Sequence, residues 1–293
     1  MKQQEIDEQV FDLYDEYCHG VINRRQFFER AAALTIAGAS ALSMAKALIP
    51  NYAQAQEVVF TDDRIKANWV DYDSPEGSSG RMRGYLVQPE GEGPFPAVLV
   101  MHENRGLNPY IQDVARRFAV AGFLALAPDG LAPIGGYPGN DDDGRAMQRT
   151  LDQSKLRQDM LNSALFVKLH ELSTGKLAAT GFCWGGGTTN FLATELAGDL
   201  QAAAPFYGAA PDTDKVKNIK AAVQVHYAEL DDRVNAMSPD YEAALAAHGV
   251  THEMHVYPGT RHGFHNYSTP RYEADAAQLA WERMVGFFSE HLG

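Results

Sequence analysis

Continuous apolar runs alternate with amphipathic stretches along the chain from Lys66 onward. Runs such as 97–101 and 123–127 contain only apolar residues, which is typical of strands buried on both faces of a sheet. Residues 110–121 repeat apolar positions at helical spacing, and Gly122 ends that stretch. The alternation predicts an α/β fold, with a mostly parallel central sheet and helices on both of its faces.

The other expected elements follow the same alternation. We expect further strands at 67–73, 82–88, 177–179, 202–206, 222–227 and 253–257, and helices at 143–171, 188–197, 239–248 and 273–292. The composition does not change within residues 56–293, so we expect them to form a single domain. In such sheets ligands bind beyond the carboxyl ends of the strands, which makes the residues that follow each strand candidates for function.

Residues 1–55 differ from the rest of the chain. Apolar residues recur at helical spacing within the acidic segment 1–20, and Arg24 and Arg25 precede an apolar stretch at 31–49. Small residues at 53–55 stand where a signal peptidase cleaves. The segment therefore resembles a twin-arginine export signal, which predicts a periplasmic or exported protein.

Charged residues weaken that interpretation. Glu29 and Arg30 stand where the apolar region should begin, and Lys46 interrupts it. The stretch is also too short and too interrupted to span a membrane. The alternative is a cytoplasmic protein whose uncleaved helical arm packs on its own domain or on a second subunit, so we expect a monomer or a homo-oligomer assembled through the arm.

Composition excludes several functions. The 293 residues are 45% hydrophobic and carry a net charge of −13, without a Lys/Arg-rich run, so nucleic acid is not an expected partner. The two cysteines, Cys18 and Cys183, lie in different kinds of segment, and we expect no disulfide between them. A single thiol in a folded domain is either reactive or simply buried.

The sequence Gly-Phe-Cys-Trp-Gly at 181–185 indicates a nucleophile. It follows an expected strand, precedes an expected helix, and matches the pattern G-x-S-x-G with Cys183 in the serine position. Side chains at either flanking position would clash in so sharp a turn, which explains both glycines. The helix N-terminus would lower the thiol's pKa and favour an oxyanion. The alternative is that Cys183 is a small buried apolar residue in a glycine-rich turn.

An acid and a histidine follow later strands in the order expected of an α/β hydrolase. Asp231 has the Asp-x-x-Val spacing that would place its carboxylate at the start of the loop, and Asp232 is the alternative acid. His262 lies in a glycine-flanked loop after the last strand, where a catalytic base would stand, and His265 is the alternative base.

Five motifs together resemble the dienelactone hydrolase family, the carboxymethylenebutenolidase-like branch of the α/β-hydrolase superfamily. They are Met-His-Glu-Asn-Arg-Gly-Leu at 101–107, Pro-Asp at 128–129, Gly-Phe-Cys-Trp-Gly-Gly at 181–186, Asp-Asp-Arg-Val at 231–234 and Tyr-Pro-Gly-Thr-Arg-His-Gly-Phe at 257–264. The resemblance extends over residues 67–293, with the motifs in the family's order.

The resemblance implies roles for individual residues. Cys183, His262 and Asp231 would form the catalytic triad, without a cofactor or a metal ion. Glu103 would hold the resting thiol and accept its proton when substrate binds. The backbone N–H groups of Asn104 and Trp184 would form the oxyanion hole; Arg105, Tyr207 and Arg261 are further candidates for binding substrate.

Two departures concern the substrate. The type enzymes of this family bind a substrate carboxylate through two arginines, one after Pro-Asp and one four residues beyond the histidine. Here Gly130 and Asn266 occupy those places, so we expect a preference for neutral esters or lactones. We expect the loop 132–143 to form part of the pocket rim or a lid. Its acidic run, 141–143, lacks the spacing of a calcium loop and is better explained as the first turn of a helix.

The sequence thus predicts a hydrolase that attacks a small ester or lactone and forms a thioester on Cys183. Two other functions remain open at this stage. A non-catalytic relative could assemble through the arm, although its set of Cys, His, Asp and Glu residues is complete. A redox-sensing thiol is the second, although no resolving cysteine lies in the expected domain.

Overall fold

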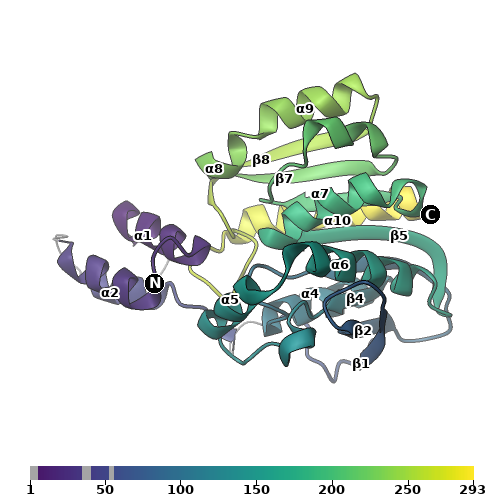
Figure 1. Cartoon of the computed structure of the whole chain (residues 1–293), viewed down its shortest axis with the longest axis horizontal. Coiled ribbons are helices and arrows are strands. Elements are labelled where there is room, and N and C mark those ends of the chain that lie inside the picture. Colours follow the sequence, from purple (N-terminus) through teal and green to yellow (C-terminus); the bar gives the residue numbers. More distant parts are fainter. Residues whose placement is uncertain (1–5, 35–40, 53–55) are drawn as a thin grey trace.

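An eight-stranded sheet forms the centre of the computed structural model, which describes residues 6–34, 41–52 and 56–293 (Figure 1). The strands are β1 (Ile65–Ser74), β2 (Gly80–Pro89), β3 (Phe95–Met101), β4 (Leu124–Pro128), β5 (Ser173–Phe182), β6 (Ala202–Phe206), β7 (Ala222–Leu230) and β8 (His252–Arg261). Their order is β1-β2-β4-β3-β5-β6-β7-β8. β2 pairs antiparallel with β1 and β4, whereas all pairs from β4 to β8 are parallel. The predicted mostly parallel sheet is confirmed.

Helices cover both faces of this sheet, as predicted. α4 (Pro109–Val120) and α10 (Ala274–Leu292) contribute to the apolar core on one face. α6 (Gln153–Lys168), α7 (Trp184–Glu195) and α9 (Ser238–Ala247) contribute to the core on the other. Burial on both faces explains why β3, β4 and β6 contain no polar residue. The two cores fix the carboxyl ends of the parallel strands at one edge, where the candidate functional residues lie.

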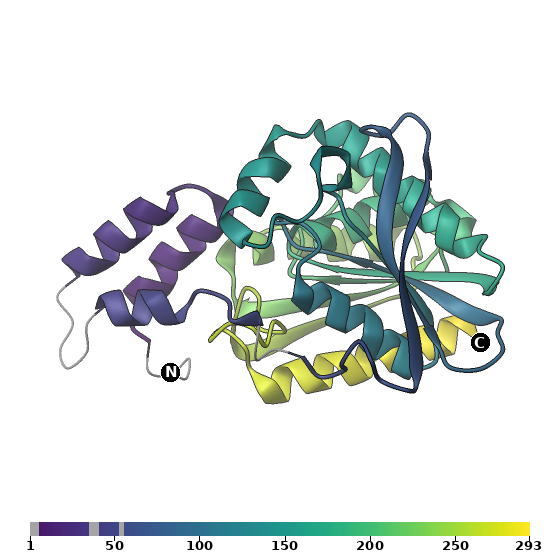
Figure 2. The same ribbon diagram turned by 90° about the horizontal axis from the view of Figure 1, so that it is seen from below.

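The N-terminal segment folds into a helical arm of α1 (Glu8–His19), α2 (Arg24–Ala33) and α3 (Ala41–Ala47). Its apolar side chains, including Val10 and Phe27, form a third core separate from the two cores of the sheet. The arm lies against one end of the domain, on the side where α8 (Asp232–Asn235) and α5 (Asp141–Thr150) are found (Figures 1 and 2). The proposed cleavage site at 53–55 lies outside the described residues.

Polar contacts attach the arm to its own domain. The side-chain amide of Asn104 donates to the backbone carbonyl of Cys18 at 2.9 Å, and Arg24 pairs with Asp142 at 2.7 Å. The arm thus packs on the domain, as in the alternative to an export signal; export itself stays a prediction. Within residues 6–34, 41–52 and 56–293, no helix combines the length and the apolar character needed to cross a membrane.

Two expected helices differ from the observed ones. The stretch 143–171 forms two helices, α5 (Asp141–Thr150) and α6, because Asp152 caps a new helix by accepting from the N–H groups of Ser154 and Lys155. α7 begins at Trp184, four residues before its expected start. The acidic run opens the first turn of α5 behind the cap Asn140, as expected.

Candidate active site

Cys183 occupies the sharp turn between β5 and α7. Its backbone has φ 58° and ψ −113°, in a region that side chains other than glycine rarely adopt. A Cβ atom at Gly181 would lie 2.4 Å from the carbonyl oxygen of Gly185, and one at Gly185 would lie 2.5 Å from that of His102. Only glycine therefore fits on either side of the cysteine, as the nucleophile-elbow pattern requires.

His262 and Asp231 meet near this turn. Each follows a strand of the parallel pair β7 and β8, so the two side chains reach the same edge of the sheet. Nδ1 of His262 lies 2.6 Å from Oδ2 of Asp231, and both side chains are buried. The alternative acid, Asp232, is exposed as the first residue of α8 (Asp232–Asn235). The alternative base, His265, is buried and pairs through Nδ1 with the hydroxyl of Tyr110 at 2.6 Å.

The electrostatics of the pair favour a thiolate and an imidazolium. Burial raises the pKa of the Cys183 thiol. The charge of His262 and the contacts with His19 and His262 lower it by more, so that the pKa lies well below its usual range. Burial lowers the pKa of His262, but the negative charge of Cys183 and the contact with Asp231 raise it to about 9. Nε2 of His262 is buried without a hydrogen-bond partner and is the nitrogen available to the sulfur.

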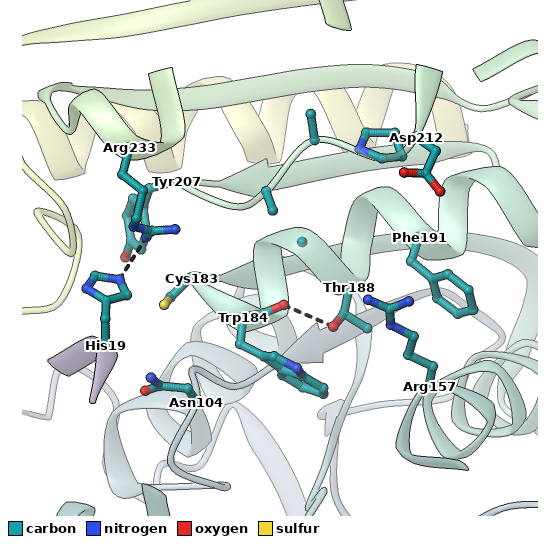
Figure 3. A pocket seen from close by; sticks show the side chains of 14 residues that line it. His19, Asn104, Arg157, Cys183, Trp184, Thr188, Phe191, Tyr207, Asp212 and Arg233 are labelled. Atoms are coloured by element: carbon teal, nitrogen blue, oxygen red, sulfur yellow. Dashed lines mark hydrogen bonds between the residues drawn. The ribbon is translucent and has the colours of Figure 1, made fainter. Parts of the chain in front are cut away.

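The arm contributes a second histidine to this site. Ligand atoms of His19, Cys183 and His262 all lie within 4.8 Å of one another, which makes them a set of metal-ligating type. Nδ1 of His19 lies 2.9 Å from the backbone oxygen of Asp15, and Nη2 of Arg233 lies 2.7 Å from its Nε2 (Figure 3). Since a guanidinium can only donate, this contact makes Nε2 of His19 an acceptor.

Glu103 follows β3 and is completely buried. Its Oε2 accepts from Arg105 at 3.1 Å and from the amide of Asn266 at 3.2 Å, whereas its Oε1 has no hydrogen-bond partner. Burial raises the pKa of Glu103, Arg105 opposes this effect, and the charge of Cys183 adds to it. A carboxyl group with a raised pKa and a free oxygen is suited to accept a proton.

Asn104 and Trp184 are brought together by the pairing of two strands. β3 and β5 are parallel neighbours, with Met101 opposite Gly181, so the residues that follow each strand lie side by side. Trp184 opens α7, and N–H groups in the first turn of a helix have no carbonyl partner within the helix. The helix dipole at this end also favours negative charge.

A cavity of about 360 Å³ opens beside Cys183, and Tyr207 and Trp184 lie in its wall (Figure 3). Arg157 from α6 and Arg233 from α8 also line it. The loop 132–143 lines none of it, contrary to the expectation of a pocket rim; residues 132–137 border a different cavity beside Asp129.

Arg105 and Arg261, two of the expected substrate-binding residues, do not line this cavity. Arg105 is 2% exposed and is held by Glu103 and Asp141. The guanidinium of Arg261 lies 4.6 Å from the ring centre of Phe11 in the arm. Arg105 is thus placed to support Glu103, and Arg261 to hold the arm.

Comparison with known proteins agrees with this geometry. The family model described as the dienelactone hydrolase family matches residues 82–292. The chain belongs to the dienelactone hydrolase family. It is therefore an α/β hydrolase of the class that acts on esters or lactones. A second family model, described as YqhI-like, matches residues 1–34, within the arm.

Individual relatives cover most of the dienelactone hydrolase domain. The Saccharolobus solfataricus protein named "Putative carboxymethylenebutenolidase" is 30% identical over 254 residues, which are 74% of this chain and 96% of that protein. The Escherichia coli (strain K12) protein named "Putative hydrolase fragment YghX" is 59% identical over 114 residues, 39% of this chain and 97% of the fragment. The structure of a dienelactone hydrolase-like promiscuous phosphotriesterase from metagenomic libraries has a TM-score of 0.67 and 27% identity, covering 78% of this chain and all (100%) of that one.

Sequence reasoning did not find three residues of the site. His19 ends an amphipathic helix and lies in no motif, so no local signal places it beside Cys183. Arg157 lies within an expected helix and Arg233 within the motif at 231–234, but only the assembled fold turns their side chains toward the cavity. An arginine at the polar face of a helix is otherwise a common surface residue.

Proposed function

We propose that this enzyme hydrolyses a small carboxylic ester or lactone through a thioester on Cys183, with His262 as the base and Asp231 as its orienting acid. The observation that carries the proposal is the 2.6 Å contact between His262 and Asp231, both buried, beside a cysteine in a strained elbow. The carboxylate holds the proton on Nδ1, which leaves Nε2 to exchange a proton with the sulfur or with substrate.

The acylation step follows from these positions. The Cys183 thiolate attacks the ester carbonyl carbon, and the carbonyl oxygen becomes an oxyanion. The N–H groups of Asn104 and Trp184 are the proposed donors to that oxyanion. As the tetrahedral intermediate collapses, the bond to the alkoxide breaks, and His262 gives the alkoxide its proton. In a lactone the alcohol formed stays attached to the acyl group.

The deacylation step uses the same histidine in the opposite sense. Formation of the thioester removes the negative charge from Cys183, which is the largest effect that raises the pKa of His262. The pKa of the imidazole then falls, so that His262 can accept a proton from water. The resulting hydroxide attacks the thioester, the carboxylic acid leaves, and the thiol is restored.

We propose that Glu103 accepts the thiol proton before attack and returns it to the sulfur after deacylation, so that His262 enters the cycle as the imidazolium and acts as the base only toward water. Its Oε1 is the oxygen without a partner, whereas Arg105 and Asn266 hold Oε2. The pKa of the Glu103 carboxyl group is raised, which brings it closer to the pKa of a thiol. Transfer of a proton from the thiol to Glu103 is therefore less unfavourable. The role supposes that Oε1 reaches the sulfur when substrate enters.

Thiol titration combined with hydrolysis of a p-nitrophenyl ester tests the proposal. Cys183→Ala is expected to remove both the rapidly reacting thiol and the ester hydrolysis. Cys18→Ala is the matched control, because it alters the only other cysteine, which is buried in the arm, and should leave both properties in place. Hydrolysis by Cys183→Ala at the wild-type rate would exclude Cys183 as the nucleophile.

A further inference from the structure

Two histidines and a cysteine surround one point at the mouth of the cavity. Their ligand atoms, from His19, Cys183 and His262, all lie within 4.8 Å of one another. Imidazole nitrogen and thiolate sulfur are the ligands that Zn²⁺ prefers in proteins. The three residues belong to the arm, the elbow and the loop after β8, so the set exists only in the folded chain.

In both histidines a carboxylate lies beside the same ring nitrogen, Nδ1. Nδ1 of His262 lies 2.6 Å from the carboxylate of Asp231, and Nδ1 of His19 lies 3.2 Å from that of Asp15. Each ring is thus oriented through Nδ1, which leaves Nε2 of His262 for a ligand, whereas Nε2 of His19 lies against Arg233. Metal-bound histidines almost always donate their second ring N–H to a carboxylate or a carbonyl in this way.

One of these nitrogens has no other partner. Nε2 of His262 is buried without a hydrogen bond, and the residue is only 5% exposed. A buried polar nitrogen without a hydrogen-bond partner is costly, and a bound metal ion would satisfy it. This observation is independent of the spacing of the three residues.

We propose that His19, Cys183 and His262 bind one Zn²⁺ ion, which blocks ester hydrolysis reversibly by occupying the thiolate. The fourth ligand would be water from the cavity, in a tetrahedral site. Ligand atoms around Zn²⁺ are roughly 3.4 Å apart, given bonds of about 2.0 to 2.3 Å. Since the ligand atoms lie within 4.8 Å of one another, the half-buried side chain of His19 has to move toward the sulfur by about 1.4 Å at most.

Zn²⁺ has to displace a proton and the guanidinium of Arg233. Cys183 binds as the thiolate and His262 as the neutral imidazole, so binding to the thiolate–imidazolium pair releases one proton to solvent. Arg233 has to leave Nε2 of His19, which its exposed side chain can do. The guanidinium and the metal ion compete for one nitrogen and repel each other, so Arg233 opposes metal binding.

Only the claim that Zn²⁺ blocks ester hydrolysis rests on the proposed function. Binding of Zn²⁺ itself is measured without substrate. Calorimetric titration of the reduced full-length protein with Zn²⁺ is expected to give one site. His19→Ala should weaken Zn²⁺ binding at least about tenfold, because loss of a ligand costs no less than loss of a group that hydrogen-bonds to a ligand. Cys183→Ala should abolish it, and Arg233→Gln should tighten it. His248→Ala, an exposed histidine of the domain, is the matched control and should change nothing.

A second readout does not depend on affinity. Co²⁺ in place of Zn²⁺ should give a thiolate-to-metal charge-transfer band in the wild type that Cys183→Ala lacks and His19→Asn alters. Equal Zn²⁺ affinity in wild type and His19→Ala, or no Zn²⁺ binding at all, would overturn the inference. If Zn²⁺ binds as expected while Cys183→Ala still hydrolyses esters, the metal site stands and the proposed nucleophile fails.

Discussion

The ring of His19 meets the ring of His262 edge to face, with centroids 5.1 Å apart and an interplanar angle of 74°. His19 ends the first helix of the arm, and His262 lies in the loop after the last strand. The contact therefore joins the arm to the loop after the last strand, beside Cys183. A change in the arm is expected to reach the nucleophile directly.

Loss of either triad partner should nearly abolish activity. His262→Ala removes the proton acceptor, and Asp231→Asn removes the carboxylate that fixes its Nδ1 proton. By analogy with other triads, each should reduce kcat roughly 10⁴-fold. Asp232→Asn is the matched control because Asp232 is adjacent and exposed. If Asp232→Asn were crippling and Asp231→Asn mild, the choice of acid would be wrong.

The pKa of His262 predicts an alkaline fall in activity. Burial lowers this pKa, but the Cys183 thiolate and Asp231 raise it to about 9. Because the imidazolium supplies the proton of the leaving group, kcat/KM for a neutral ester should fall as the pH rises through about 9. Asp231→Asn removes one effect that raises the pKa of His262. The alkaline fall of the residual activity of this variant should therefore begin at a lower pH than in the wild type. An alkaline limb that stays in place in Asp231→Asn would contradict this assignment.

Removal of residues 1–55 should leave a folded domain with a more accessible thiol. The core of the arm is separate from the two cores that hold the sheet, so of the residues named in those cores the sheet loses only Tyr52, which packs at the edge of one of them. Loss of His19 uncovers Cys183, and reaction with a bulky maleimide should become faster. Circular dichroism and the rate of thiol modification measure the two effects. An insoluble truncated protein, or unchanged thiol reactivity, would show that the arm has another role.

The charge of the cavity predicts how the enzyme treats an anionic substrate. The sequence suggested neutral substrates because Gly130 and Asn266 replace two arginines, but Arg157 and Arg233 line the cavity instead. Arg157 is exposed, and no carboxylate of the described residues pairs with it, so it is free to bind one. We expect Arg157→Gln to lower kcat/KM about tenfold for a carboxylate-bearing ester and little for its neutral analogue.

Lys155→Gln is the control for that experiment. It removes an exposed positive charge from the same helix without altering the cavity wall. An equal loss for both substrates in Arg157→Gln, or the same loss in Lys155→Gln, would rule out a specific contact between Arg157 and the carboxylate.

The pattern of apolar residues was sufficient for the sheet and insufficient for the helix boundaries. β6 was predicted with its observed bounds because all five of its residues are buried and apolar. α7 was predicted to start too late because three glycines, 185–187, are poor helix formers. A Cβ at Gly186 would lie 2.3 Å from the carbonyl oxygen of Phe206, so packing against β6 requires glycine there. That requirement is visible only in three dimensions.

The site divides in the same way. Cys183, Asp231 and His262 could be proposed from the sequence because each follows a strand of a parallel sheet, and the fold brings such positions together. His19 could not be proposed, since its place depends on how a separate helical unit docks on the domain. The expectation of no metal ligands arose for the same reason, because no local spacing joins residues of the arm to those of the domain.

The location of the covalent intermediate tests the central claim most directly. Enzyme quenched during turnover of a slowly hydrolysed ester, then digested and analysed by mass spectrometry, should carry the acyl group on the peptide that contains Cys183. The adduct should be released by hydroxylamine and be absent from Cys183→Ala, which should also be inactive. An acyl group on another residue, or full turnover by Cys183→Ala, would contradict the account.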